Sequence, residues 1–140
     1  MVRGQVHDET SWSLGGVTGN AGLFSTAADL LALGLVLSQP VESGLLDEDQ
    51  WRWSTTDQRP PAAQGDYGQA VGLRVGDPGL TPGLDHWCGH TGFTGTSLVL
   101  EPGTGTVGVL LTNRVHPRRE WSDLREIRRE FTRIVHDFAT

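Results

Sequence analysis

The C-terminal segment of the chain carries the strongest structural signal in the sequence. Its apolar residues recur at intervals of three and four, which is typical of one stripe of an amphipathic helix, and Arg and Glu fill the opposite face. The spacing predicts a helix over residues 118–139. Because a single apolar stripe must be buried against something, this helix requires a second layer of structure. The residues of the stripe are Trp121, Leu124, Ile127, Phe131, Ile134, Val135 and Phe138.

The preceding segment, residues 67–116, is expected to supply that layer as β-strands. Residues 67–75 alternate in the manner of a strand, and the clearest strand segments are 87–90, 96–100 and 106–112. Residues 101–105, Glu-Pro-Gly-Thr-Gly, form a hairpin signal between the last two. We therefore predict an α+β fold, with an antiparallel sheet of about three strands and the C-terminal helix packed on it.

The N-terminal part of the chain is expected to form a loop and then two helices. Residues 1–24 are rich in glycine and read as an irregular loop, and helices are expected within residues 26–56. The first helix begins with the capping sequence Thr26–Asp29 and should end at Pro40, and a shorter helix should start near Asp47. The first helix is apolar on almost every face, more than so small a sheet can cover. This mismatch indicates that residues 1–140 are one part of a single larger domain.

Composition excludes several classes of function. The chain has 11 Arg and no Lys, so it cannot contain a P-loop lysine, a Schiff-base lysine or a Ser-x-x-Lys nucleophile pair. The net charge is −6 and no basic stripe is present, so nucleic-acid binding is not expected. Cys88 is the single cysteine, which excludes an internal disulfide. No apolar run is long enough to span a membrane and no signal peptide is visible, so the default location is the cytoplasm.

Three local patterns leave alternative functions open. The spacing Gly16-x-x-Gly19-x-x-Gly22 before a helix is compatible with a phosphate cradle, although no lysine follows it. The spacing His86-x-Cys88-x-His90 would place two imidazoles and a thiolate on one strand face, where zinc is a conceivable ligand, but no fourth ligand is evident. None of the eight serines lies in a G-x-S-x-G elbow, which disfavours a self-contained serine hydrolase.

Three sequence blocks in a fixed order resemble a known family. The first covers residues 4–30 and includes Leu-Gly-Gly-Val-x-Gly-x-Ala-Gly-Leu-Phe-Ser-Thr-Ala; the second is His90-Thr91-Gly92 with the residues that follow it; the third is residues 109–117. Together they resemble the serine β-lactamase and penicillin-binding-protein superfamily, in the branch of class C β-lactamase-related esterases and D-peptidases. The resemblance implies a β-lactamase/transpeptidase-like fold and hydrolysis of an ester, amide or β-lactam through an acyl-enzyme.

The resemblance also implies roles for individual residues. His90 takes the place of the triplet lysine of the family and is expected to hydrogen-bond the substrate and the proton-shuttling groups. Thr91 would offer its hydroxyl to a substrate carboxylate or acyl group, and Gly92 would let the substrate backbone lie close to the strand. The backbone N–H of Phe93 would be half of the oxyanion hole. Three more residues in matching segments are expected on the substrate side: Thr94, His7 and Asp8.

The departures from the family pattern concern the nucleophile. The Ser-x-x-Lys motif is absent, and the single tyrosine, Tyr67, is followed by Gly68 and Gln69 rather than by the Tyr-x-Asn or Tyr-x-Ser sequence of the family. We therefore expect a C-terminal segment of a β-lactamase-related hydrolase that is inactive alone, uses no metal or other cofactor and meets a small acyl substrate in the parent enzyme. The alternative is a non-catalytic module, one half of a split protein that docks on an N-terminal chain, or a self-associating protein.

Overall fold

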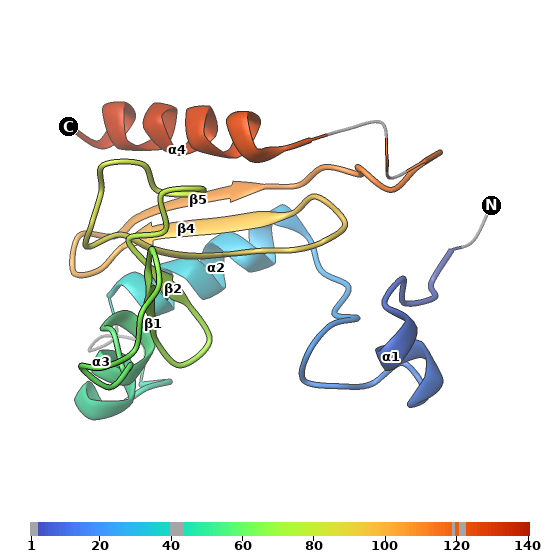
Figure 1. Ribbon diagram of the computed structural model, residues 1–140, viewed down its shortest axis with the longest axis horizontal. Coiled ribbons are helices and arrows are strands. Elements are labelled where there is room, and N and C mark those ends of the chain that lie inside the picture. Colours follow the sequence, from blue (N-terminus) through green and yellow to red (C-terminus); the bar gives the residue numbers. More distant parts are fainter. Residues whose placement is uncertain (1–2, 40–43, 119, 121–122) are drawn as a thin grey trace.

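The fold is a single antiparallel sheet with helices on both faces. The computed structural model describes residues 3–39, 44–118, 120 and 123–140, so Pro40 and Trp121 lie outside the described residues. The strands follow the order β1-β2-β3-β4-β5, with α2 on one face of the sheet and α4 on the other (Figure 1). The α+β prediction is confirmed. The elements are α1 (Glu9–Ser13), α2 (Ala27–Ser38), α3 (Glu48–Thr55), β1 (Gly68–Gln69), β2 (Arg74–Val75), β3 (Cys88–Thr91), β4 (Ser97–Glu101), β5 (Thr106–Leu110) and α4 (Arg125–Ala139).

The sheet has five strands because the expected strand over residues 67–75 is a hairpin. β1 and β2 are two residues each and pair with one another, and β2 continues onto β3. The backbone reverses at Gly72, which has a φ of +87°, and the Ala70 N–H donates to the Leu73 carbonyl at 2.9 Å. The alternation of residues 67–75 continues through this reversal and gives no sign of a turn, so the prediction of one strand here is wrong.

The core is divided between the two faces of the sheet. Because successive residues of a strand point to opposite faces, β3 and β4 contribute to both halves. The α2 side and the α4 side each hold three fully or nearly buried residues. On the α2 side these are Leu73, Cys88 and Leu100, with Leu37, Val75 and Val107 packed against them. On the α4 side they are Leu80, Trp87 and Val99, with Leu84, Phe131 and Val135.

Helix α2 starts as the sequence predicts and approaches the sheet very closely. The Thr26 hydroxyl accepts the N–H of Asp29 at 3.2 Å, which satisfies one unpaired donor of the first turn. Gly34 is buried against the sheet, and a Cβ atom there would lie 2.4 Å from Val107. The opposite faces of α2 remain uncovered, because Leu31 and Leu35 are 40% and 47% exposed.

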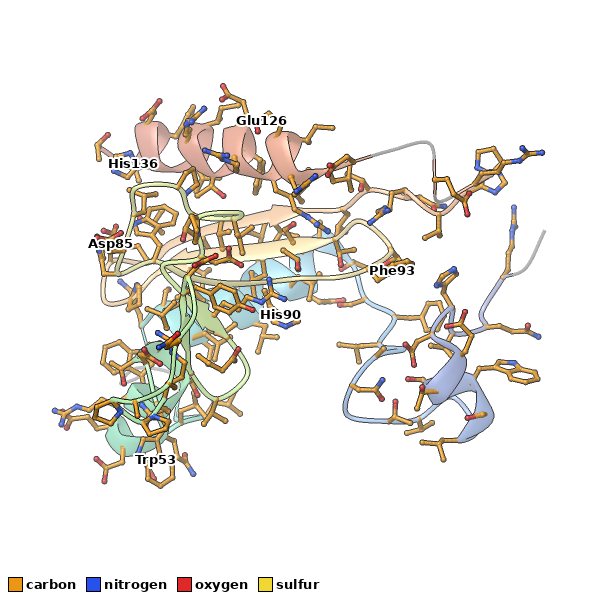
Figure 2. The ribbon with its side chains drawn as sticks, in the orientation of Figure 1. Trp53, Asp85, His90, Phe93, Glu126 and His136 are labelled. Carbon is orange, nitrogen blue, oxygen red and sulfur yellow. The ribbon has the colours of Figure 1, made fainter. Side chains whose placement is uncertain are left out.

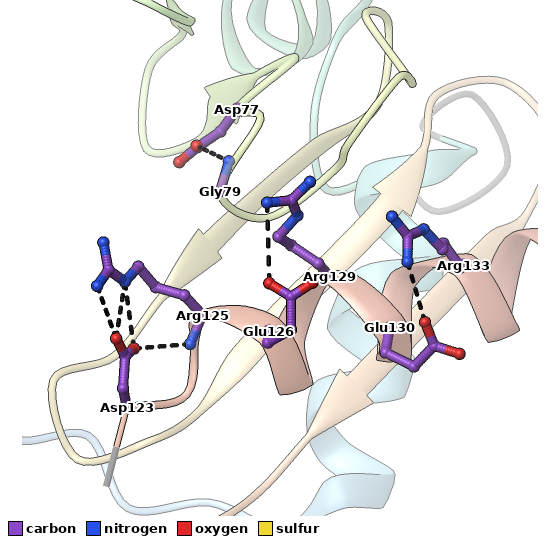
Figure 3. A network of polar contacts seen from close by, with 8 residues as sticks. All are labelled: Asp77, Gly79, Asp123, Arg125, Glu126, Arg129, Glu130 and Arg133. Atoms are coloured by element: carbon purple, nitrogen blue, oxygen red, sulfur yellow. Dashed lines mark hydrogen bonds and ion pairs between the residues drawn. The ribbon is translucent and has the colours of Figure 1, made fainter.

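Helix α4 is shorter than the predicted span of residues 118–139. The helix begins at Arg125, whose backbone N–H donates to the Asp123 carboxylate just before the helix at 3.0 Å. On its outer face the helix carries exposed ion pairs, Glu126 with Arg129 and Glu130 with Arg133 (Figure 3). None of the described helices is both long enough and apolar enough to cross a membrane.

The N-terminal loop contains a short helix that the glycine pattern conceals. Asp8 accepts the N–H of Ser11 at 2.8 Å and so caps α1. The buried Ser11 hydroxyl bonds the Thr18 hydroxyl at 2.7 Å, which closes the loop on itself. This segment lies beyond the end of the sheet, away from α3 (Figure 1).

Candidate functional site

The predicted site residues lie at the end of β3 and in the turn that follows it. We call residues 92–96 the site turn; it connects β3 to β4. The Gly92 N–H donates to the Thr96 carbonyl at 2.8 Å, and the Gly95 N–H donates to the Gly92 carbonyl at 3.1 Å. Two further bonds hold the turn to the strand end beyond β5: the Thr112 hydroxyl donates to the Gly95 carbonyl at 2.7 Å, and the Arg114 N–H donates to the Thr94 carbonyl at 3.0 Å.

His90 lies on the α2 side of the sheet and is exposed. It is opposite Leu98 on β4, whose side chain reaches toward Gly34 of α2. Partial desolvation, together with the positive charge of Arg74, lowers the pKa of His90 below its usual value. An imidazole with a lowered pKa is mostly neutral at pH 7, so it can accept as well as donate a hydrogen bond.

Thr91 and Gly92 are placed differently from His90. Strand alternation puts the Thr91 side chain on the α4 side, opposite Ser97, so His90 and Thr91 do not share a face of β3. Packing within the turn leaves no room for a side chain at Gly92, because a Cβ atom there would lie 2.2 Å from the Thr96 hydroxyl oxygen. β2 pairs with β3 only at residues 88 and 89, so in the described part of the chain this edge of β3 is open beside His90 and Thr91.

Phe93 and His7 are brought together from distant parts of the sequence. Their rings stack with centroids 5.8 Å apart and an interplanar angle of 21°. The guanidinium carbon of Arg114 lies 5.1 Å from the centroid of the same phenyl ring, within the range of a cation–π contact. Figure 2 shows Phe93 at the end of the sheet that faces the N-terminal segment. Thr94 is half-buried in the same turn.

The Asp8 carboxylate is hydrogen-bonded within the N-terminal segment, where it caps α1. It accepts from the Ser11 N–H at 2.8 Å and from the Asn20 amide at 3.2 Å. Backbone and side-chain hydrogen bonds from Ser11 are the main reason that the pKa of Asp8 is lowered. In this structure Asp8 therefore holds α1 and the loop near His7.

Two of the three residues in the zinc pattern have other roles in the fold. Cys88 is fully buried, its thiol donates to the Thr55 carbonyl at 3.2 Å, and desolvation raises the thiol pKa to about 12. His86 precedes β3 and bonds the Glu101 carboxylate at 2.8 Å. Among the described residues, no three His, Cys, Asp or Glu side chains gather in a way that would hold a metal ion.

Neither of the two other local patterns forms the site that it suggested. Gly22 has a φ of +98°, and a Cβ atom there would lie 2.9 Å from Val6, so this glycine is required for loop packing. Within the described part of the chain, no serine hydroxyl is hydrogen-bonded to an imidazole, so a serine nucleophile beside a histidine base is not formed.

Three arginines that the sequence did not single out act on this region, two of them at the site turn and the third, Arg74, through its charge on His90. Arg128 of α4 donates to Ser97 and to two carbonyls of the turn, Arg114 contacts Phe93, and Arg74 forms an ion pair with Asp77 at 2.9 Å. Desolvation, followed by the charges of Arg114 and Arg74, lowers the pKa of Arg128. One signal for Arg128 was present in the sequence: it interrupts the apolar stripe between Leu124 and Phe131, on the face that must pack on the sheet.

Comparison with known proteins decides the family. A family model described as Beta-lactamase matches residues 2–132, which is most of the chain. This chain belongs to the beta-lactamase family. The family assignment agrees with the resemblance inferred from the three sequence blocks and with the α+β fold.

Similar curated proteins carry one description. A "Putative D-alanyl-D-alanine carboxypeptidase" of Escherichia coli (strain K12) is 35% identical over 127 residues, and a protein of the same description from Salmonella gallinarum is 38% identical over 122 residues. Each alignment covers 81% of this chain and 27% of the relative, so the chain spans about a quarter of the length of these relatives. No solved structure matches the chain.

Proposed function

We propose that this chain forms one wall of a serine acyl-transfer site, with the nucleophile supplied by polypeptide outside its 140 residues. The observation that carries the proposal is the exposure of His90 beside the open edge of β3, next to the site turn, which is held by hydrogen bonds from several elements. The chain in which this occurs belongs to the beta-lactamase family. The reaction would be transfer of an acyl group to a serine and then to water, with an ester, amide, β-lactam or D-peptide as substrate.

The residues of this wall would act by orientation and by hydrogen bonding. A neutral imidazole at His90 can hydrogen-bond the substrate or take part in proton transfer without carrying a fixed charge. The Phe93 N–H would be one oxyanion donor, and such a donor contributes roughly 10²–10³ in rate in other hydrolases. Arg114 and Arg128 at the site turn, together with the charge of Arg74 that acts on His90, would favour binding of a substrate carboxylate.

The first experiment uses the chain alone. No burst is expected with a chromogenic ester or a cephalosporin, because the chain has no Ser-x-x-Lys pair to form an acyl-enzyme. A burst that persists after replacement of His90, and of each serine in turn, would contradict the site assignment.

The second experiment restores the missing part. The segment of the E. coli relative that aligns with this chain is replaced by the chain itself, and the folded chimera is tested with a fluorescent penicillin. Covalent labelling, located by mass spectrometry outside the transplanted segment, supports the proposal. A chimera that is folded by circular dichroism and is not labelled counts against it.

A second candidate function is association through the free edge of the sheet. β5 is the last strand of the described sheet, and both α2 and α4 make most of their sheet contacts with it. Ile134 and Phe138 of α4 are 56% and 94% exposed there, beside a groove of about 450 Å³ that Val107 of β5 also lines. An unpaired strand edge flanked by apolar side chains is a template for another strand.

Association can be tested by light scattering after size exclusion. A mass that is a multiple of 15.2 kDa, reduced to one unit by Ile134→Glu, supports self-association through this edge. Stable co-purification with the N-terminal part of the E. coli relative, lost in the same variant, supports docking on a complementary chain. A compact monomer that binds no such chain contradicts both forms.

A further inference from the structure

We propose that Arg128 is the positioning residue that orients the Phe93 N–H; the functional meaning of this orientation rests on the proposed acyl-transfer site. Arg128 projects from the sheet-facing side of α4 and makes three hydrogen bonds. Its Nε donates to the Ser97 hydroxyl at 3.0 Å, and its Nη2 donates to the Gly92 carbonyl at 2.8 Å and to the Thr96 carbonyl at 3.2 Å. One side chain thus joins both ends of the site turn to the helix.

The bond to Gly92 determines a direction as well as a position. The Gly92 carbonyl and the Phe93 N–H belong to the same peptide group, which is planar, and in a trans peptide they point in opposite directions. Arg128 pulls this carbonyl toward α4, so the Phe93 N–H is directed away from α4, to the side of the sheet where His90 lies. His90 and the Phe93 N–H, the two groups assigned to substrate contact, therefore lie on the same side of the sheet. They do so because Arg128, on the opposite side, holds the peptide group between Gly92 and Phe93.

The geometry requires arginine in particular. The guanidinium is a planar fork, and here its Nε and Nη2 bond a hydroxyl and two carbonyls at the same time. A lysine ammonium has three N–H donors but only one nitrogen, so it cannot place one donor at the Nε position and another at the Nη2 position. The cost of keeping the guanidinium at this place is visible in the lowered pKa that desolvation and the neighbouring arginines give it.

Inside the turn the Gly92 carbonyl also accepts the Gly95 N–H at 3.1 Å, and two bonds from outside the turn hold its other carbonyls. The Thr112 hydroxyl holds the Gly95 carbonyl, and the Arg114 N–H holds the Thr94 carbonyl. Neither reaches the Gly92 carbonyl. Removal of Arg128 should therefore leave the first peptide of the turn with the local bond from Gly95 and loosen its orientation, while the middle of the turn stays attached to the strand end beyond β5.

The experiment compares Arg128→Met with Arg133→Met by NMR on the full chain. Arg133 is the matched control, because it lies on the same helix and its hydrogen bond is to the exposed Glu130. In Arg128→Met we expect the Phe93 amide resonance to shift and the exchange of the Gly92 and Gly95 amides to rise tenfold or more, with the amides of β4 unchanged. Arg133→Met should leave all of them as in the wild type.

Two results would overturn the proposal. One is a uniform rise in exchange across β4 and the turn in Arg128→Met, which is what loss of helix docking alone would produce. The other is wild-type protection of the turn in Arg128→Lys, which also provides the test if the methionine variant does not fold. Since no substrate is used, absence of acyl-transfer activity would refute the proposed function and leave this proposal standing.

Discussion

Gly95→Ala should destabilise the chain far more than Gly103→Ala, and the difference measures how tightly the site turn is packed. Both glycines have a positive φ, +114° at Gly95 and +86° at Gly103, so alanine introduces backbone strain of about 1–2 kcal/mol at either position. Only at Gly95 does the new methyl group also collide: it would lie 2.3 Å from the Thr112 hydroxyl and 3.1 Å from Leu124. Such overpacking costs about 1–3 kcal/mol.

The expected loss in the free energy of unfolding is therefore about 2–5 kcal/mol for Gly95→Ala and about 1–2 kcal/mol for Gly103→Ala. At Gly103 nothing lies within 4 Å of the added atom, which makes it a control for strain alone. Urea unfolding followed by tryptophan fluorescence gives both values, and the slopes should be equal because the exposed surface is the same.

A double-mutant cycle makes the test specific to the contact. In a Thr112→Ala background the closest colliding atom is gone, so the additional cost of Gly95→Ala should fall toward the value for Gly103→Ala. Equal losses for the two glycines in the wild-type background would refute the packing argument, and so would a Gly95→Ala cost that is independent of residue 112.

Three further outcomes follow from the packing and electrostatics. Gly34→Ala should destabilise by about 1–3 kcal/mol in urea unfolding despite the better helix propensity of alanine, because the methyl group meets Val107; a gain in stability would contradict the close approach of α2 to β5. The pKa of Glu101 is lowered chiefly by its bond to His86, so Glu101 contributes stability above the ordinary glutamate pKa and loses it as pH falls through the folded pKa. Unfolding curves should show Glu101→Gln less stable than the wild type at pH 7, and the difference in the free energy of unfolding should vanish as pH falls below about 4. A difference that does not change with pH would contradict the role of the bond between Glu101 and His86. Cys88 should resist iodoacetamide at pH 8 in the folded chain and react on unfolding in urea, because its pKa is raised to about 12 by burial; fast labelling of the folded chain would contradict that burial.

The parts of the fold with strong local signals were predictable from the sequence. Three features are each predicted by a few neighbouring residues. They are the glycine-containing hairpin after Glu101, the Thr26 cap of α2 and the Asp47 start of α3. The hairpin of β1 and β2 was not predictable, because its strands are only two residues long and the whole segment alternates like one strand. The later start of α4, where the Arg125 N–H donates to Asp123, could not be placed from the apolar stripe, because the stripe already includes Leu124 before the helix.

The sequence predicted only those residues of the candidate site that are consecutive in the chain. The His90-Thr91-Gly92 triplet could be recognised, but strand alternation places Thr91 on the face opposite His90. The contact between His7 and Phe93 joins residues far apart in the sequence and needs the folded chain. Arg128 was not predicted, although a charged residue at a position of the buried stripe requires a partner and so could have indicated it.

The position of His90 gives the most direct test of the acyl-transfer proposal. In the chimera with the E. coli relative, the rate of labelling by a fluorescent penicillin is measured for His90→Ala and for the matched control His86→Ala, an exposed histidine whose partner is Glu101. We expect a fall of roughly 10²-fold or more for His90→Ala, with little change for His86→Ala. Equal labelling rates for the two variants would contradict the acyl-transfer proposal.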